Sequence, residues 1–121
     1  MTATFDTWAW IEYFAGSKKG ERVKAIVDST EAIVTPSLCL LELKAKYLKE
    51  NKSCEKEIEF VCFRSKIAVL SKEIALRAAE EKIERGLHAS DAVVYATAVL
   101  AESKLFTGDP HLRGFERVEF L

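Results

Sequence analysis

The chain has 121 residues, 49% of them hydrophobic and 31% charged, and its formal net charge is −1. This composition is typical of one globular domain over residues 1–121, and it excludes a disordered or low-complexity protein. No apolar stretch approaches the roughly 20 residues of a membrane helix and no signal-peptide layout opens the chain, so we expect a cytoplasmic protein without a membrane partner.

Strand-like and helix-like segments alternate along the chain. In order, we predict a strand over residues 2–6, helices over 8–14 and 19–28, a strand over 31–35, helices over 36–50 and 53–64, a strand over 67–70, helices over 71–85 and 87–102, and strands over 104–107 and 117–121. Strands separated by helices favour right-handed crossovers. The expected fold class is therefore α/β, a three-layer α/β/α sandwich with a mostly parallel central sheet of four to five strands.

Individual residues support several of these boundaries. Thr35 followed by Pro36 predicts an N-cap and a proline at the first helical position. Ser53 is a predicted cap for the next helix, and Gly86 suits the end of the helix over 71–85. In the helix that starts at Pro36, helical spacing predicts an inward apolar face formed by Leu38, Leu41, Ala45 and Leu48.

The three cysteines are Cys39, Cys54 and Cys62, an odd number without CxxC spacing. Two of them lie in apolar helical patterns. We therefore expect buried, reduced thiols rather than a metal or redox site.

Four acidic residues interrupt otherwise apolar segments. Asp6 ends the first strand, Asp109 directly follows the fourth, Glu42 lies between leucines on a helix, and Asp91 is in the first turn of an alanine-rich helix. Taken singly, each has an ordinary structural explanation. Asp91 opposes a helix dipole, Asp109 shapes a turn, and Glu42 pairs with Lys46 one helical turn later.

Taken together, the four acids indicate a ligand site. Ligands of open α/β sheets bind beyond the carboxyl ends of the strands, where two of the acids lie. Two carboxylates about 5 Å apart repel by about 3 kcal/mol at an effective dielectric constant of 20, and a domain's net stability is only about 5–15 kcal/mol. Such a cluster requires protons, basic partners or a hard cation. Oxygen ligands without a His–Cys set suit Mg²⁺ or Mn²⁺.

The same residues form a series of short motifs. They are Asp6-Thr7 after the first strand, Glu42 within Leu-Leu-Glu-Leu, Asp91-Ala92 opening the alanine-rich helix, and Thr107-Gly108-Asp109. In this order, and over nearly the whole chain, they resemble the PIN-domain signature, most nearly that of the small single-domain toxins of the VapC type. The resemblance implies a PIN-like sandwich and a metal-dependent endoribonuclease, the toxin of a toxin–antitoxin pair. Its RNA products would carry a 5′-phosphate and a 3′-hydroxyl.

The resemblance also implies roles for individual residues. Thr7 and Thr107 would be polar supports that orient a carboxylate or a bound water. The implied partners are RNA, a small VapB-like antitoxin and a second copy of the chain in a homodimer. The implied cofactor is one or two Mg²⁺ or Mn²⁺ ions, held by catalytic carboxylates of Asp6, Glu42, Asp91 and Asp109.

Some residues depart from the family pattern or have more than one interpretation. Trp8 and Trp10 stand where smaller residues are commoner, and Leu112 stands where Phe is frequent, so substrate preference and partner surface stay open. An exposed Trp beside the acids would stack a base or seat an antitoxin helix. His111 is expected to be a solvent-facing loop residue, with contact to phosphate as the alternative, and His88 a cap or surface residue.

Two other functions fit parts of the sequence. A catalytically silent PIN-like binding or scaffold module would keep all four acids, and metal titration would distinguish it from an enzyme. A receiver-type signalling domain would have paired acids after its first strand and a lysine after a later one. Here Asp6 stands alone and no lysine follows Thr107. The net charge of −1 provides no bulk attraction for nucleic acid, so metal and local basic patches must supply the attraction if the protein handles RNA.

Overall fold

The computed structural model describes residues 2–121, in which strands and helices follow one another as expected. The elements are β1 (Thr2–Phe5), α1 (Thr7–Ala15), α2 (Gly20–Val27), β2 (Ala32–Pro36), α3 (Ser37–Lys49), α4 (Glu55–Arg64), β3 (Lys66–Ala68), α5 (Lys72–Arg85), α6 (Ala89–Leu100), β4 (Lys104–Thr107), the 3₁₀ turn η1 (Pro110–Leu112) and β5 (Val118–Phe120). The predicted order of elements is confirmed.

The strands form one parallel sheet of five strands in the order β3-β2-β1-β4-β5. The first strand is central: Thr4 is in register with Val34 of β2 on one side and with Leu105 of β4 on the other. The chain first builds outward from β1 to β3 and later returns to the opposite side of β1. The carboxyl ends of β1 and β4 therefore flank the point where the winding direction reverses, the usual ligand position in such sheets.

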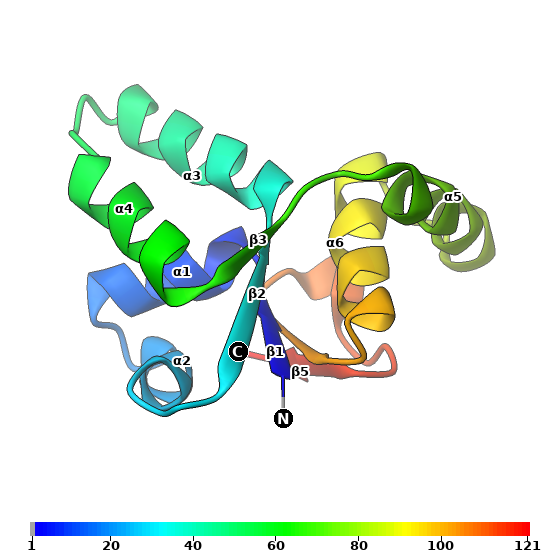
Figure 1. The fold of residues 1–121 in the computed structure, drawn as a ribbon, viewed down its shortest axis with the longest axis horizontal. Coiled ribbons are helices and arrows are strands. Elements are labelled where there is room, and N and C mark those ends of the chain that lie inside the picture. Colours follow the sequence, from blue (N-terminus) through cyan, green and yellow to red (C-terminus); the bar gives the residue numbers. More distant parts are fainter. Residues whose placement is uncertain (1) are drawn as a thin grey trace.

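Helices cover both faces of the sheet, which confirms the three-layer sandwich (Figure 1). One core cluster packs the first four helices, α1, α2, α3 and α4, against one face of the sheet. Phe5 and Phe106 belong to this cluster, and the buried ring of Trp10 contacts Phe5. The other joins α5 and α6 to the opposite face, around Tyr95 and Leu105. The successive residues Leu105 and Phe106 of β4 thus belong to different cores, as the two-residue period of a strand requires.

Hydroxyl groups are buried within the sheet and are paired with one another. Thr4 Oγ1 lies 2.5 Å from Ser103 Oγ. Thr35 Oγ1 accepts a hydrogen bond from Trp10 Nε1 at 3.0 Å and lies 2.8 Å from Ser65 Oγ. Because each buried group has a partner, these pairs stabilise the contact between strands and helices without leaving an unsatisfied polar atom.

The predicted start of α3 is wrong in detail. The helix begins at Ser37, and Pro36 occupies the N-cap position with no side-chain cap. Thr35 is the buried partner of Trp10 described above, so its hydroxyl is not available to cap the helix. Ser53 is likewise not the cap of α4, since Cys54 occupies that position and makes no side-chain cap hydrogen bond.

The predicted inward face of α3 is also wrong. Leu41 and Leu48 are 64% and 61% exposed, whereas Cys39 and Leu43 are buried. The helix carries two sets of apolar side chains, and the buried set, Cys39 and Leu43, packs into the two core clusters. Helical spacing alone cannot distinguish the two.

The third strand is shorter than predicted. β3 ends at Ala68, and Val69 and Leu70 are exposed in the link to α5. Because β3 is an edge strand that pairs with β2 only as far as Pro36, pairing ends before the apolar run does. The cysteines are free thiols: Cys39 and Cys54 are buried as expected, but Cys62 is exposed, contrary to the prediction.

Within residues 2–121, no helix combines the length and the apolar character that crossing a bilayer requires.

Candidate functional site

Asp6 lies at the carboxyl end of β1 and serves two structural purposes. It is the N-cap of α1, where its Oδ1 accepts a hydrogen bond from the Ala9 amide at 2.9 Å. Its side chain is almost fully buried. Because one carboxylate oxygen is held by the backbone, the second remains to face a ligand.

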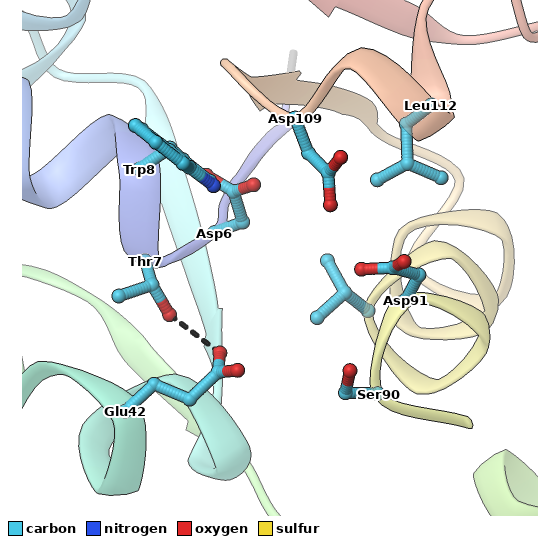
Figure 2. Close-up of a pocket in the computed structure, with 9 residues that line it drawn as sticks. Asp6, Thr7, Trp8, Glu42, Ser90, Asp91, Asp109 and Leu112 are labelled. Carbon is cyan, nitrogen blue, oxygen red and sulfur yellow. Dashed lines mark hydrogen bonds between the residues drawn. The ribbon is translucent and has the colours of Figure 1, made fainter. Parts of the chain in front are cut away.

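Glu42 reaches the same region from α3. The Thr7 hydroxyl donates a hydrogen bond to Glu42 Oε1 at 2.7 Å, and Thr7 directly follows Asp6 in the chain. Figure 2 shows this bond and the Glu42 carboxylate directed into the space between α1, α3 and α6. A carboxylate supported in this way has fewer orientations to lose when it binds a ligand.

Asp109 follows β4, the strand next to β1. Its amide donates to Thr107 Oγ1 at 2.9 Å, so the Thr107 hydroxyl shapes the turn that carries it. Its own Oδ1 accepts from the His111 amide and lies 2.9 Å from His111 Nδ1. Asp109 therefore caps η1 while its second oxygen stays on the side of the pocket (Figure 2).

Asp91 enters from the first turn of α6 on the opposite face of the sheet. One carboxylate oxygen each of Asp91 and Asp109 and one ring nitrogen of His111 lie within 4.8 Å of one another, close enough for a shared metal ion. The two faces of the sandwich thus meet at this edge of the sheet.

The structure brings all four predicted acids to one pocket (Figure 2). Its volume of about 140 Å³ is enough for an ion with several waters. The lining side chains come from four separate segments of the chain. They are Asp6, Thr7, Trp8, Glu42, Ser90, Asp91, Val94, Asp109 and Leu112.

Electrostatic strain is visible in the pKa values of the acids. Burial raises the pKa of Asp6 to about 7, against the Thr107 hydroxyl and the Ala9 amide, which lower it, and the charges of Asp109 and Glu42 add to the increase. Burial also raises the pKa of Asp91 to about 6, and neighbouring Asp109 contributes. For Asp109 partial burial acts upward, but hydrogen bonds from His111 and Asp91 outweigh it and lower the pKa. These carboxylates resist being charged together.

The donor set fits a hard divalent cation. Across residues 2–121, no lysine or arginine forms an ion pair with any of the four acids, and the one basic contact is that of His111 with Asp109. Carboxylate oxygens without a cationic partner match Mg²⁺ or Mn²⁺, which prefer oxygen ligands.

Several lining residues were not predicted from sequence. Ser90 precedes Asp91 on α6, and Val94 lies one turn later, so position relative to a predicted acid could have indicated both. Leu112 is buried beneath the pocket. His111 is mostly exposed, as expected, but it also contacts Asp109. His88 occupies the N-cap position of α6 without a side-chain cap, and its ring lies edge-on to that of His111, with centroids 5.8 Å apart.

Comparison with known protein families gives a match along almost the whole chain. The family model described as "PIN domain" matches residues 3–121, which include all four acids. A search of curated proteins gave no significant match.

Comparison with solved structures gives similar folds. A chain of a toxin–antitoxin complex from Klebsiella pneumoniae is 24% identical with a TM-score of 0.80, covering 97% of this chain and 95% of that chain. VapBC2 from Rickettsia felis, bound to a DNA fragment from its promoter, is 15% identical with a TM-score of 0.71, and the match covers 100% of this chain and 98% of that chain. VapC20 from Mycobacterium tuberculosis, a sarcin–ricin loop cleaving toxin, is 18% identical with a TM-score of 0.69, and the match covers 97% of this chain and 98% of that chain. At these identities the likeness establishes the fold.

Proposed function

The chain belongs to the PIN-domain family, and we propose that it is a metal-dependent endoribonuclease, the toxin of a toxin–antitoxin pair. The observation that carries this proposal is the convergence of Asp6, Glu42, Asp91 and Asp109 on one pocket without a lysine or arginine partner in the described part of the chain. The similar fold of a toxin that cleaves the sarcin–ricin loop supports RNA as the substrate.

We propose that these four carboxylates hold one or two Mg²⁺ or Mn²⁺ ions and are the catalytic residues. When bound, a divalent ion supplies a water of lowered pKa and offsets charge on the phosphate. The Ala9 amide fixes Asp6, and the Thr7 hydroxyl fixes Glu42. Thr107 orients the turn at Asp109. The protein thus contributes carboxylates already held in place, which reduces the cost of ordering them at the moment of reaction.

The reaction would be hydrolysis of an RNA phosphodiester bond. Water attacks phosphorus, the bond from phosphorus to the 3′ oxygen breaks, and the products carry a 5′-phosphate and a 3′-hydroxyl. Val94 and Leu112 bound the inner side of the pocket, where they restrict bulk water. Low local polarity strengthens the attraction between the carboxylates and any cation they hold.

The surface supports more than one protein partner. On one face of the sandwich, α3 and α4 expose Leu41, Leu48 and Phe63, and on the other the segment around α5 exposes Leu76 and Ile83. Two separate apolar regions fit a small VapB-like antitoxin and a second copy of the chain in a homodimer. The solved relatives that are toxin–antitoxin complexes support the first. Light scattering of the chain alone, and with the product of a neighbouring small reading frame, measures both.

The test of the nuclease is cleavage of fluorescein-labelled RNA oligonucleotides of randomised sequence in Mg²⁺ or Mn²⁺. Loss of a residue that only supports a metal ligand typically costs about 10- to 100-fold, so Asp91→Asn should lower the rate at least about 100-fold. Asp28→Asn, which removes a surface charge paired with Lys24, is the control and should cleave normally. Equal rates for Asp91→Asn and wild type, or wild-type cleavage that persists in EDTA, would refute the proposal. Binding of Mn²⁺ without any cleavage would indicate a scaffold module.

A further inference from the structure

Trp8 is an exception among the aromatic residues of the first helix. Trp10, two positions later, is 1% exposed and contacts four other rings in the core, Phe5, Tyr13, Phe14 and Phe60. Trp8 is 47% exposed, and it makes no ring–ring contact with any of residues 2–121. Exposing half of so large an apolar side chain forgoes stabilisation that burial would provide, so its position calls for an explanation beyond folding.

The Trp8 side chain lies beside Gly108, the residue before Asp109. A Cβ atom at Gly108 would lie 3.6 Å from Trp8 Cβ and Cε3 and 3.7 Å from Cδ2, so the ring rests against the turn between β4 and Asp109. Figure 2 shows the ring almost edge-on, beside Asp6 and on the same side of the pocket. The aromatic plane thus lies next to the acids.

The pocket around Trp8 is otherwise polar on its open side. Of the apolar residues that line it, Val94 and Leu112 are buried, whereas Trp8 is exposed. A protein helix needs several neighbouring apolar contacts to dock, whereas a nucleobase needs one flat π surface. The surroundings of Trp8 therefore favour a base over a protein segment.

We infer that Trp8 stacks against an unpaired base of single-stranded RNA whose phosphate lies at the acidic pocket. This inference rests on the proposed nuclease function, and it names the feature of the substrate that Trp8 would bind, an unpaired base. Trp8 is thus a substrate-positioning residue, and the substrate class is RNA with an unstacked base beside the cleaved bond. The net charge of −1 provides no bulk attraction for nucleic acid, so RNA binding by this chain would depend on local contacts such as this one.

The first experiment measures binding in EDTA, using a fluorescently labelled single-stranded RNA oligonucleotide. Loss of one base–aromatic stack should weaken binding about 5- to 100-fold in Trp8→Ala. Trp8→Phe, which keeps an aromatic face, should stay within about threefold of wild type. Val69→Ala shortens an apolar side chain that is 67% exposed but does not line the pocket, so it should bind like wild type.

Tryptophan emission provides a second readout of the same titration. The chain has 2 tryptophans, and Trp10 is buried, so RNA that stacks on Trp8 should quench the exposed component of the emission. The quenching should disappear in Trp8→Phe although binding persists. Equal affinity of wild type and Trp8→Ala, unquenched emission in the wild type, or no RNA binding by the wild type would each overturn the inference.

The second experiment locates the stacked base. In cleavage of an RNA of defined sequence, replacing nucleotides one at a time by abasic sites should lower kcat/KM at one position for wild type, and Trp8→Ala should be insensitive to that replacement. If Asp91→Asn cleaves like wild type, the nuclease proposal fails while the binding result still decides the role of Trp8. If Trp8→Ala changes the oligomeric state but not RNA affinity, the ring belongs to a protein interface and stacking is overturned.

Discussion

Two regions of this molecule bury polar side chains, and they do so in opposite ways. Inside the sheet, Thr35, Ser65 and Trp10 are neutral and satisfy one another. At the carboxyl ends of β1 and β4, the pocket gathers like charges, and burial raises the pKa of Asp6 to about 7. Buried polar groups that are hydrogen-bonded to one another stabilise the fold, whereas buried carboxylates without a cationic partner indicate a site for a ligand.

The largest effect on the difference between the two regions is expected from a substitution of Asp6. In metal-free protein, Asp6→Asn keeps an oxygen that can accept from the Ala9 amide but removes the buried charge. The wild-type carboxyl has a pKa of about 7 when folded and 3.8 as its ordinary value. From about pH 4 to pH 7 the unfolded chain has released this proton while the folded chain retains it, so wild-type stability falls as pH rises through that window. At pH 8 in EDTA we expect Asp6→Asn to be more stable by about 2–4 kcal/mol.

Urea unfolding at pH 8 and at pH 4 measures this difference, which should be largely absent at the lower pH. Asp28→Asn alters an exposed carboxylate on α2 and should show no such pH dependence. Added Mn²⁺ should stabilise the wild type at pH 8 and stabilise Asp6→Asn less. A variant less stable than wild type at pH 8 would show that the acid is matched after all.

A smaller effect is expected at Thr7, whose hydroxyl supports Glu42. Thr7→Val removes this hydrogen bond without changing the number of carboxylates. We expect kcat/KM for RNA cleavage to fall about 10- to 100-fold, which corresponds to about 1.4–2.8 kcal/mol. Steady-state kinetics at several Mn²⁺ concentrations measure the loss, and Thr7→Ser should restore most of the activity. No loss in Thr7→Val would mean that Glu42 is oriented by other contacts.

The smallest effect is expected in the matched region. Thr35→Val leaves the buried Trp10 Nε1 without its acceptor, at a cost of about 1–2 kcal/mol in the free energy of unfolding. Thr4→Val should cost less, because Ser103 Oγ also lies within hydrogen-bonding reach of the Ala98 carbonyl. Urea midpoints measure both, and cleavage by the folded protein should be unchanged. Equal costs for the two variants would contradict the role given to the Trp10 contact.

The sequence predicted the sheet, the layers and the convergence of the acids because those depend on strong local patterns. Asp6 and Asp109 end parallel strands, and strand ends meet at one edge of a sheet whatever the details of packing. The inward face of α3 could not be predicted in the same way. Leu41 and Leu48 are as apolar as the buried Leu43, and packing against the other elements of the molecule decides which of them is buried.

The role of Thr35 was obscured for a related reason. A threonine before a proline carries the same local signal whether it caps a helix or ends a strand, and the partner that decides, Trp10, lies on another element. The site shows the same limit. His111 stands two residues after Asp109, but its contact with that carboxylate depends on the η1 turn. This turn is too short to be predicted from the spacing of apolar residues in the sequence.

The central place of β1 has a consequence for the order in which the molecule is made. Asp6 and Glu42 leave the ribosome before Asp91 and Asp109, and β1 can pair with β2 before β4 exists. The other neighbour of β1, which is β4, and the Asp109 that follows it are translated later. A nascent chain therefore carries two of the four acids before the other two are made, and it completes the acidic pocket only when β4 docks beside β1.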